Sequence, residues 1–404
     1  MKKIVFFFVL LIFSISANDF EEFKQQQLGQ FTDYKENLEK DFQNYVNIIN
    51  EEYSKYKKDI KKVWNDEKVA EKEVWVQYSE DMKNRKIVDF DKNTITIEAV
   101  VDKKATKEEI EKLFMIEFGN LVLTDTQTAY KNDKLMQNID NRLKKELENH
   151  DKKSETDKRP LIADIYLNKD TNKDLVLNRT DVQNTLEIAK KTISKTPVVI
   201  KKANEKNKQI VSINIQMPSD TTLKKAAGFK KDVMKFSNEE KVDPALVYAI
   251  MHSESSFNPM ARSHIPAYGL MQIVPQSAGR DVSMKIYKED RILSPKYLYD
   301  STNNIRAGAT YLNILYYRYL SSIENPKSRL YCTVAAYNTG AGNVAKAFTG
   351  KTNIREASKI INKMTPEQVY NKLLTSLPYE ETINYLKKVN ERIAIYDNVL
   401  KRGL

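Results

Sequence analysis

The sequence predicts an α+β amino-terminal domain, residues 18–218, followed by an all-α domain, residues 219–404. Two observations lead to this division. Short segments in which apolar and polar residues alternate, the pattern of half-buried strands, precede position 218. Beyond the Met-Pro-Ser-Asp stretch at 217–220, strand patterns vanish and the chain is typical of helices joined by loops with Pro, Ser, Asn and Gly.

Composition is that of a globular protein with a basic charge balance. The chain has 404 residues, of which 41% are hydrophobic and 30% charged, enough for two or three domains with apolar cores. Its formal net charge of +11 favours polyanionic partners such as cell-wall polymer or an anionic membrane surface, although diffuse solubilising charge explains it equally well. Because lysines are scattered among glutamates and no basic tract is interleaved with aromatic residues, no nucleic-acid partner is indicated.

Residues 1–17 have the pattern of a secretory signal peptide: two lysines at 2–3, an apolar run at 4–13 and small residues at 14–17. The run is shorter than the roughly 20 residues that span a membrane, although an uncleaved anchor is the alternative interpretation. The only cysteine, Cys332, is far from this segment, so neither a disulfide nor an amino-terminal lipid is expected. An exported protein of a bacterial periplasm or cell envelope is therefore predicted, with membrane association left open.

Within residues 18–218 the patterns predict a small, mostly antiparallel sheet with helices. Aromatic and aliphatic residues recur at steps of three and four over 20–70, which predicts one long amphipathic helix, or two with a single break. Such a helix either packs on its own domain or contacts a partner or a membrane surface. The other expected elements are strands at 87–90, 94–101, 161–167 and 208–216, helices at 106–118 and 135–147, and a polar loop at 150–159.

A helix predicted from Asp243 onward brings one acidic residue to its apolar face. Asp243 is a suitable N-cap, and Pro244 suits the first helical position. Glu254 follows Val247 by seven positions and Ile250 by four, so the three side chains share a face. Loss of hydration there would raise the pKa of the carboxyl and keep a proton available for general-acid chemistry. On spacing alone, a glutamate that swings into solvent at the helix end is the alternative.

The loop after this helix carries groups that suit a carbohydrate. The helix is expected to stop within residues 255–259, because the residue before a proline disfavours helical geometry. Ser263 offers a hydroxyl, Gly269 permits close backbone approach, and Gln272 supplies both a donor and an acceptor. Further along, the AAYNTG segment at 335–340 sets a phenol and an amide at a predicted helix end.

Taken in order, the segments ESSFNPMARS with GLMQ, then AAYNTG, then YEETINYL resemble the lytic transglycosylases, enzymes with a goose-lysozyme-like fold that cleave bacterial peptidoglycan. The resemblance covers about residues 230–400, and the amino-terminal domain more loosely resembles the accessory domain of a membrane-bound subfamily. It implies a lysozyme-like catalytic domain at 219–404, with peptidoglycan glycan strands as the substrate. Cell-wall machinery is a further conceivable partner.

The resemblance also implies a mechanism with one carboxyl group. Glu254 aligns with the family's catalytic acid, which protonates the bond between N-acetylmuramic acid and N-acetylglucosamine. The same carboxylate then takes the proton of the sugar's 6-hydroxyl, which closes a 1,6-anhydro ring without water. Tyr337 matches the family tyrosine that hydrogen-bonds near the acid, and a structural role is the alternative for it. Positions that line the glycan cleft, with the same alternative, are matched by Ser263, Gln272, Asn338, Glu381 and Tyr385.

The sequence departs from the family pattern in two places. Pro266, Ala267 and Tyr268 stand where the family usually has Gly-Ala before its GLMQ-type segment, which predicts a stiffer or reshaped cleft roof. The membrane-bound subfamily is typically anchored through an amino-terminal cysteine that carries a lipid. This chain has no such cysteine, so attachment to a membrane is in doubt.

Other kinds of chemistry find little support. The three histidines lack the spacing of a metal site, and no glycine-rich phosphate loop appears, so neither metal nor cofactor is expected. Cys332 lies in an apolar run and is predicted to be a core residue. A lysozyme-type hydrolase remains an alternative, as does a non-catalytic cell-wall-binding scaffold, against which the intact Glu254 and Tyr337 argue. The hydrolase would need a second carboxylate, for which the candidates are Asp281, Glu289, Asp290 and Glu381.

Overall fold

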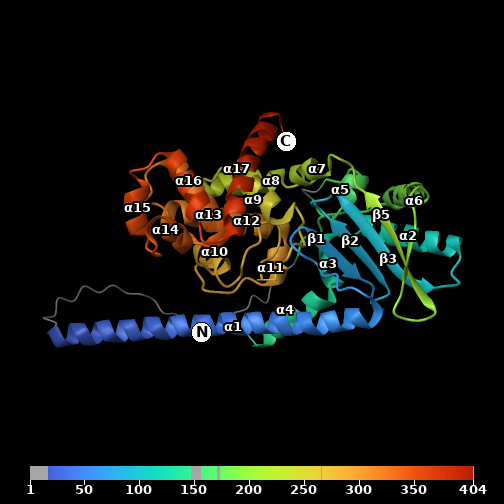
Figure 1. Ribbon diagram of the computed structural model, residues 1–404, viewed down its shortest axis with the longest axis horizontal. Helices are drawn as coiled ribbons and strands as arrows, with labels where there is room; N and C mark the ends of the chain where they lie inside the picture. The colour runs from blue at the N-terminus through green and yellow to red at the C-terminus, as the bar shows by residue number, and fades with distance from the viewer. Residues whose placement is uncertain (1–16, 147–155, 171–172, 265, 404) are drawn as a thin grey trace. The chain divides into compact units, whose positions relative to one another are not determined.

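The computed structural model describes residues 17–146, 156–170, 173–264 and 266–403 (Figure 1). The predicted signal peptide therefore lies outside the described residues except for Ala17, and so does most of the predicted loop at 150–159. The chain divides into two compact units, residues 1–48 and 49–404, and the second contains the sheet and helices α2 to α17. Among the described residues, no helix is both long enough and apolar enough to cross a membrane.

The long helix predicted near the amino terminus is a single helix, α1, which runs from Ala17 to Val63. In the second unit its last turns pack on the sheet. Ile60 is fully buried, and Trp64, which follows the helix, is also buried and donates from Nε1 to the carbonyl of Met82 at 2.7 Å. Tyr53 and Tyr56 pack against the same apolar cluster. Of the two readings of this helix, packing on its own domain is confirmed for these turns.

The sheet has five antiparallel strands in the order β1-β2-β3-β5-β4. The expected strands at 87–90, 94–101 and 208–216 are confirmed, and the sequence patterns missed the short β1 and the exposed edge strand β4. In the register of the central strand β3 with β5, Ile97 lies opposite Ile213. The strand bounds are β1 Val74–Tyr78, β2 Asn84–Asp89, β3 Thr94–Asp102, β4 Val199–Lys202 and β5 Lys208–Gln216.

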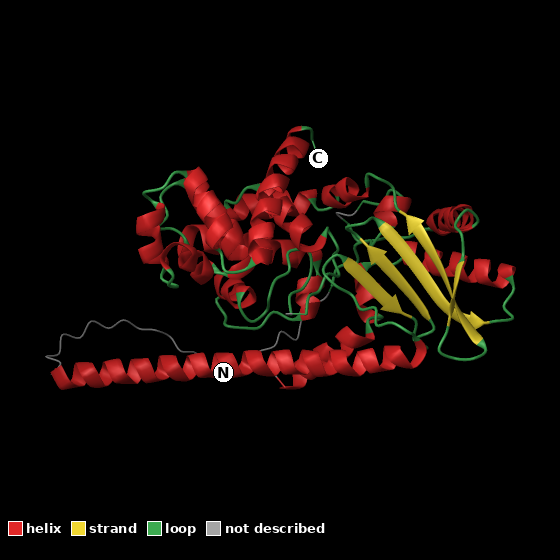
Figure 2. Cartoon of the chain, viewed as in Figure 1, coloured by secondary structure: helices red, strands yellow, loops and turns green. Residues whose placement is uncertain are grey.

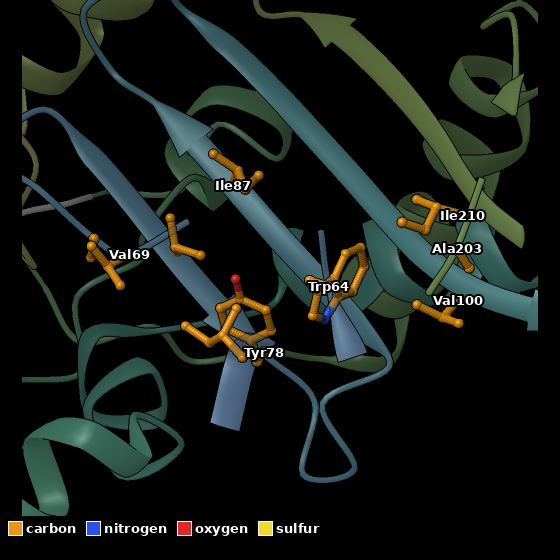
Figure 3. Close-up of a cluster of buried hydrophobic side chains, with 10 residues drawn as sticks. Trp64, Val69, Tyr78, Ile87, Val100, Ala203 and Ile210 are labelled. Atoms are coloured by element: carbon orange, nitrogen blue, oxygen red, sulfur yellow. The ribbon is translucent and has the colours of Figure 1, made fainter. Parts of the chain in front are cut away.

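Each face of the sheet is covered. On one face, Lys86 of β2 lies beside Ile97, its partner on β3. Lys86 forms an ion pair at 3.2 Å with Glu117 of α2, so α2 covers this face. Helix α2 spans Lys107–Val122, and α6, Arg179–Ile193, packs beside it. The opposite face carries the apolar cluster drawn in Figure 3. Its labelled members are Trp64, Val69, Tyr78, Ile87, Val100, Ala203 and Ile210.

Helix expectations in this part are confirmed and one strand expectation is wrong. Helix α2 begins after Thr106, whose side chain forms a capping box with Glu109, and α4 spans Lys134–Glu146. Residues 161–167 are not a strand, because Ala163–Tyr166 form the short helix α5. The apolar run there is buried, and periodicity cannot distinguish a short buried helix from a strand.

After β5 ends at Gln216, all regular elements of the described chain are helical (Figure 2). The predicted order of an α+β part followed by an all-α part is thus confirmed. A π-helical turn, Leu315–Tyr319, extends α12. The bounds are α3 Thr126–Lys131, α7 Thr221–Ala227, α8 Lys230–Glu240, α9 Pro244–Ser255, α10 Ala278–Tyr287, α11 Pro295–Tyr299, α12 Ser301–Ile314, α13 Pro326–Thr339, α14 Ala341–Thr349, α15 Ile354–Ile361, α16 Pro366–Ser376 and α17 Glu380–Lys401.

Candidate active site

Helix α9 places Glu254 in its last turn. Asp243 caps the helix by accepting a hydrogen bond from the backbone N–H of Ala245 at 2.8 Å, and Pro244 occupies the first turn, as predicted. The helix ends where Ser256 adopts a left-handed backbone with φ 49°. Packing against α8 and α17 buries α9 on nearly every side. The side chain of Glu254 is only 6% exposed, which excludes the alternative that it swings into solvent.

The carboxyl of Glu254 has one distant cationic neighbour. The ammonium Nζ of Lys72 lies 3.8 Å from Oε2 of Glu254 and also 3.8 Å from Oε1 of Glu381. Burial raises the pKa of Glu254; Lys72 and Tyr385 lower it, whereas the negative charges of Glu381 and Glu73 raise it again. The net result is a raised pKa, because a weak ion pair does not compensate for the lost hydration.

A cleft of about 610 Å³ opens over this carboxyl. It is lined by six of the seven residues that the sequence singled out, and the seventh, Tyr385, is buried beside Glu254 rather than in the cleft wall. These six are Glu254, Ser263, Gln272, Tyr337, Asn338 and Glu381, and the rest of the lining is formed by Lys72, His264, Ala267, Val274, Thr339, Asn343, Tyr379 and Thr382.

Two tyrosines contact the surroundings of Glu254 in different ways. The hydroxyl of Tyr337 donates to the backbone carbonyl of Met271 at 2.8 Å, so its hydrogen bond goes to the cleft wall and not to the acid. The buried hydroxyl of Tyr385 makes no full hydrogen bond to any described residue, yet it lies close enough to Glu254 to lower the pKa of that carboxyl. Burial raises the pKa of both phenols, so both are neutral donors at ordinary pH.

The segment 269–272, of which Gln272 lines the cleft, is held in place by Asn304 of α12. Its Oδ1 accepts from the N–H of Met271 at 2.8 Å, and its Nδ2 donates to the carbonyls of Tyr268 and Leu298 at 2.8 and 2.7 Å. Gly269, at φ +75°, is needed for this approach, because an added Cβ would stand 2.3 Å from Nδ2 of Asn304. The close approach predicted for Gly269 is therefore confirmed. Asn304 itself was missed, since nothing in the sequence around it indicates its distant partners.

Gln272 lines the cleft, and its side chain contains a buried acceptor atom that is unpaired. It takes a left-handed backbone, with φ 46°, and its Nε2 donates to the carbonyl of Gly269 at 3.0 Å. Its Oε1 is buried and has no hydrogen-bond partner among the described residues. A buried amide oxygen without a hydrogen-bond partner is costly, because it has lost its hydration and gained no replacement.

The remaining predicted residues come from three elements. Ser263 lies in the loop before the GLMQ segment and donates its backbone N–H to the carbonyl of Ala267 at 3.2 Å. The Oδ1 of Asn338, at the end of α13, accepts from the hydroxyl of Thr382 at 2.7 Å. Glu381, in the first turn of α17, has a side chain that is 78% exposed. Pro266 is buried in the same loop as Ser263. The altered cleft roof that it suggests stays a prediction.

Among the candidates for a second carboxylate, Glu381 is the member that lines the cleft. Asp281 accepts from the hydroxyl of Tyr319 at 2.8 Å, and Asp290 pairs with Arg280 at 2.7 Å.

Within the described ranges, no group of three or more His, Cys, Asp or Glu side chains could hold a metal ion. Cys332 is fully buried, as predicted for a core residue, and burial raises the pKa of its thiol.

Sequence reasoning also missed Lys72. It precedes β1, in the part of the chain with no recognised catalytic motif, yet its ammonium reaches the cleft. It is one of 66 lysines and arginines in the sequence, and nothing in its neighbourhood distinguishes it from the others. Only the packing of the chain brings it to Glu254.

Comparison with known proteins confirms the resemblance inferred from the motifs. Residues 233–361 match the family described as "Transglycosylase SLT domain". Residues 38–118 match "Membrane-bound lytic murein transglycosylase C, N-terminal domain". These two matches lie on the helical part and on the sheet-bearing part, in the order that the sequence predicted.

Curated relatives named membrane-bound lytic murein transglycosylase C align with part of the chain. The protein from Sodalis glossinidius is 46% identical over 183 residues, 45% of this chain and 50% of the relative. That from Klebsiella pneumoniae subsp. pneumoniae is 42% identical over 191 residues, 47% of this chain and 52% of the relative. The chain thus spans about half the length of the curated relatives it matches. A solved structure, the 70 kDa soluble lytic transglycosylase of Escherichia coli, is 22% identical with a TM-score of 0.34, covering 45% of this chain and 28% of that one.

Proposed function

We propose that this chain, whose residues 233–361 form a transglycosylase SLT domain, is a peptidoglycan lytic transglycosylase. It cleaves the β-1,4 bond between N-acetylmuramic acid and N-acetylglucosamine without water and leaves 1,6-anhydro-muramyl ends. The observation that carries the proposal is Glu254, a buried carboxyl with a raised pKa that lines a cleft together with many polar side chains. Residues 219–404 act as the catalytic domain and 18–218 as an accessory domain.

Glu254 acts first as an acid and then as a base. Its protonated form donates to the glycosidic oxygen, so that the bond to the anomeric carbon breaks and the leaving sugar takes the proton. The muramyl N-acetyl oxygen stabilises the cation that remains. Glu254, now a carboxylate, takes the proton of the 6-hydroxyl as that oxygen attacks the anomeric carbon, which restores the acid for the next turnover.

The surroundings of Glu254 support both halves of this cycle. Burial favours the protonated form that begins the reaction. After proton transfer, the neutral Tyr385 hydroxyl and the Lys72 ammonium stabilise the carboxylate. Tyr337 acts indirectly, because its hydroxyl donates to the Met271 carbonyl and so holds the backbone next to Gln272 in place.

The polar side chains of the cleft suit the hydroxyl and acetamido groups of a glycan. The amide side chain of Gln272 lines the cleft and is of a type that can both donate to and accept from a sugar. Ser263, Asn338 and Glu381 extend the same wall and are assigned to substrate binding. No step in this scheme calls for a metal or an organic cofactor.

We place the substrate, and therefore the protein, in the bacterial envelope. Curated relatives carry the name membrane-bound, and the family matched by residues 38–118 carries it too. The net charge of +11 favours contact with a polyanionic wall or with a membrane surface. A periplasmic location, reached by the predicted signal peptide, is the finer form of this proposal.

Digestion of purified sacculi in oxygen-18 water, followed by mass spectrometry of the released fragments, tests the reaction. The proposal predicts anhydro-muramyl ends that contain no solvent oxygen. Reducing ends labelled with oxygen-18 would instead identify a lysozyme-type hydrolase, with Glu381 the carboxylate available in the cleft. Binding to sacculi without any release would identify a non-catalytic scaffold.

A further inference from the structure

We propose that Lys72 is a positioning residue of the active site, supplied by the sheet-bearing part of the chain, that bridges Glu254 and Glu381 and sets the pH range over which Glu254 exchanges its proton. The inference concerns the same cleft and rests on the proposed function for its catalytic meaning. The effect of Lys72 on the titration of Glu254 can be measured without turnover. Lys72 lies outside the SLT match at 233–361, so the amino-terminal part becomes a component of the site itself.

The position of the ammonium group is the first observation. Nζ of Lys72 stands 3.8 Å from an oxygen of Glu254 and 3.8 Å from an oxygen of Glu381, and the side chain lines the cleft. It is 33% exposed, whereas the side chain of Glu381 is 78% exposed and that of Glu254 only 6%. The cation therefore lies between a buried carboxyl and one that faces solvent.

The backbone that carries Lys72 is fixed on the sheet side. Val69 and Ala70, immediately before it, are buried in the apolar cluster that covers one face of the sheet (Figure 3). The N–H of Glu71 then donates to the carbonyl of Val74 at 2.8 Å, which closes a tight turn before β1. Lys72 sits within this turn, so its main chain has little freedom.

The same turn is bound to the loop that follows the catalytic helix. Asn258, fully buried and four residues after Glu254, donates from Nδ2 to the carbonyl of Lys72 at 3.1 Å. The N–H of Arg262 donates to the carbonyl of Glu71 at 3.4 Å. These contacts couple the position of Lys72 to the loop that builds the cleft wall.

The charged groups around Glu254 explain how the Lys72 ammonium affects the protonation of this carboxyl. The other titratable groups that interact with Glu254 come from several parts of the chain. Glu73 precedes β1, Glu381 and Tyr385 belong to α17, and Tyr337 belongs to α13. Burial and the two neighbouring glutamates favour the protonated form of Glu254, and Lys72 opposes them. Without Lys72 the carboxyl would hold its proton more firmly, and the carboxylate that remains after it donates to the glycosidic oxygen would be less stabilised, so Glu254 would be a weaker acid in the first half of the reaction.

The titration of Glu254 itself is the direct test, and it needs no turnover. The protein is labelled with carbon-13 at the glutamate carboxyls, and the Glu254 signal is identified by its absence from Glu254→Gln. We expect Lys72→Met to move the titration midpoint upward by about half a pH unit or more, since unit charges 4 Å apart interact appreciably even in water. Lys72→Gln repeats the test with a polar side chain, should the methionine disturb folding.

Two further variants separate charge from packing. Lys72→Arg keeps the cation and should titrate close to the wild type. Lys83→Met removes an exposed lysine, outside the cleft lining, that lies 3.9 Å from Asp81, and should leave the Glu254 midpoint unchanged. A Glu254 midpoint that is the same in Lys72→Met, Lys72→Gln and the wild type would overturn the inference.

The pH profile of kcat/KM on a glycan substrate gives the catalytic counterpart. The alkaline limb of Lys72→Met should move to higher pH and that of Lys72→Arg should not, whereas a purely structural role would lower activity without moving the limb. The two proposals fail separately. A wild type without activity whose Glu254 midpoint still responds to Lys72 would refute the reaction alone, and an active wild type whose midpoint ignores Lys72 would refute this inference alone.

Discussion

Two buried glutamates, one on the sheet and one on helix α9, have opposite electrostatic surroundings. Glu98 of β3 is 1% exposed and contacts Arg85 at 2.6 and 2.7 Å, with Lys68 and Lys201 each at 3.4 Å. Burial alone would raise the pKa of Glu98, but Arg85 and the two lysines outweigh it and the pKa is lowered. Glu254 is nearly as buried, has its nearest cation at 3.8 Å, and keeps a raised pKa.

The difference shows that burial does not by itself identify an acid. A buried carboxyl that is fully paired remains ionised and serves the fold, because its charge is compensated at hydrogen-bond distance. A buried carboxyl that is left underpaired holds a proton and becomes available for chemistry. Pairing with cations, rather than exposure to solvent, distinguishes these two residues.

The largest effect is expected from Glu254→Gln. Loss of the acid and base should lower turnover of sacculi by about 10³-fold or more, because general acid–base groups contribute on that scale. Binding to glycan strands should survive, since the cleft side chains remain. Release of anhydro-muropeptides and pull-down on sacculi measure the two properties, and a variant that retains most of its turnover would exclude Glu254 as the acid.

The matched change on the sheet, Glu98→Gln, should act on stability instead. It leaves the buried Arg85 guanidinium with Asp66 at 2.7 Å as its remaining carboxylate partner. We expect a loss of about 3 kcal/mol in the free energy of unfolding, the lower end for breaking a buried ion pair. Denaturant unfolding measures it. Activity per folded molecule should stay close to that of the wild type, and a selective loss of turnover would contradict the comparison.

A smaller effect is expected at the phenol that acts through the cleft wall. Tyr337→Phe removes the donor to the Met271 carbonyl and should cost about 1 kcal/mol of stability and roughly tenfold in kcat/KM. Tyr311→Phe is the control, since Tyr311 packs against Tyr337 with ring centroids 5.5 Å apart and does not line the cleft. Equal losses in the two variants would indicate a general effect of removing a phenol hydroxyl from this aromatic pair, not the loss of the specific hydrogen bond to Met271.

The smallest effect is a pH dependence of opposite sign at the two glutamates. The pKa of Glu254 is raised on folding, so its contribution to stability is present at low pH and is lost as pH rises from about 4.3, the usual value, through the raised one. The pKa of Glu98 is lowered, so its contribution is present above about 4.3 and is lost as pH falls through the lowered value.

Unfolding curves between pH 3 and 8 test this difference. Relative to the wild type, Glu254→Gln should become more stable as pH rises, whereas Glu98→Gln should lose least at the acidic end. Parallel stability curves for the two variants would show that the two carboxyls have the same protonation behaviour.

The sequence could predict the parts of this account that depend on local pattern. Helical spacing and capping residues predicted that Glu254 lies on a buried helix face, and the turn residues after it predicted the loop that contains Gly269. Period-two alternation located the three longer strands. These features are set by neighbours a few positions away, which a single sequence contains.

What could not be predicted depends on contacts between distant segments. Lys72 and Asn304 reach the site only through packing of the sheet-side turn and of α12, and their own neighbourhoods are ordinary. The apolar pattern of residues 161–167 predicts a strand where the structure has helix α5, because a short buried helix has the same apolar composition as a strand. The sequence likewise does not show that Glu98 is closely paired whereas Glu254 is not, because only folding brings Arg85 and Lys68 to Glu98.

The comparison is tested most directly by titrating both carboxyls in the same wild-type sample. Carbon-13 glutamate labelling, with signals assigned through Glu254→Gln and Glu98→Gln, reports the two midpoints side by side. We expect a midpoint above the usual glutamate value for Glu254 and below it for Glu98. A Glu254 midpoint at or below the usual value would contradict the claim that underpairing keeps this carboxyl protonated for catalysis.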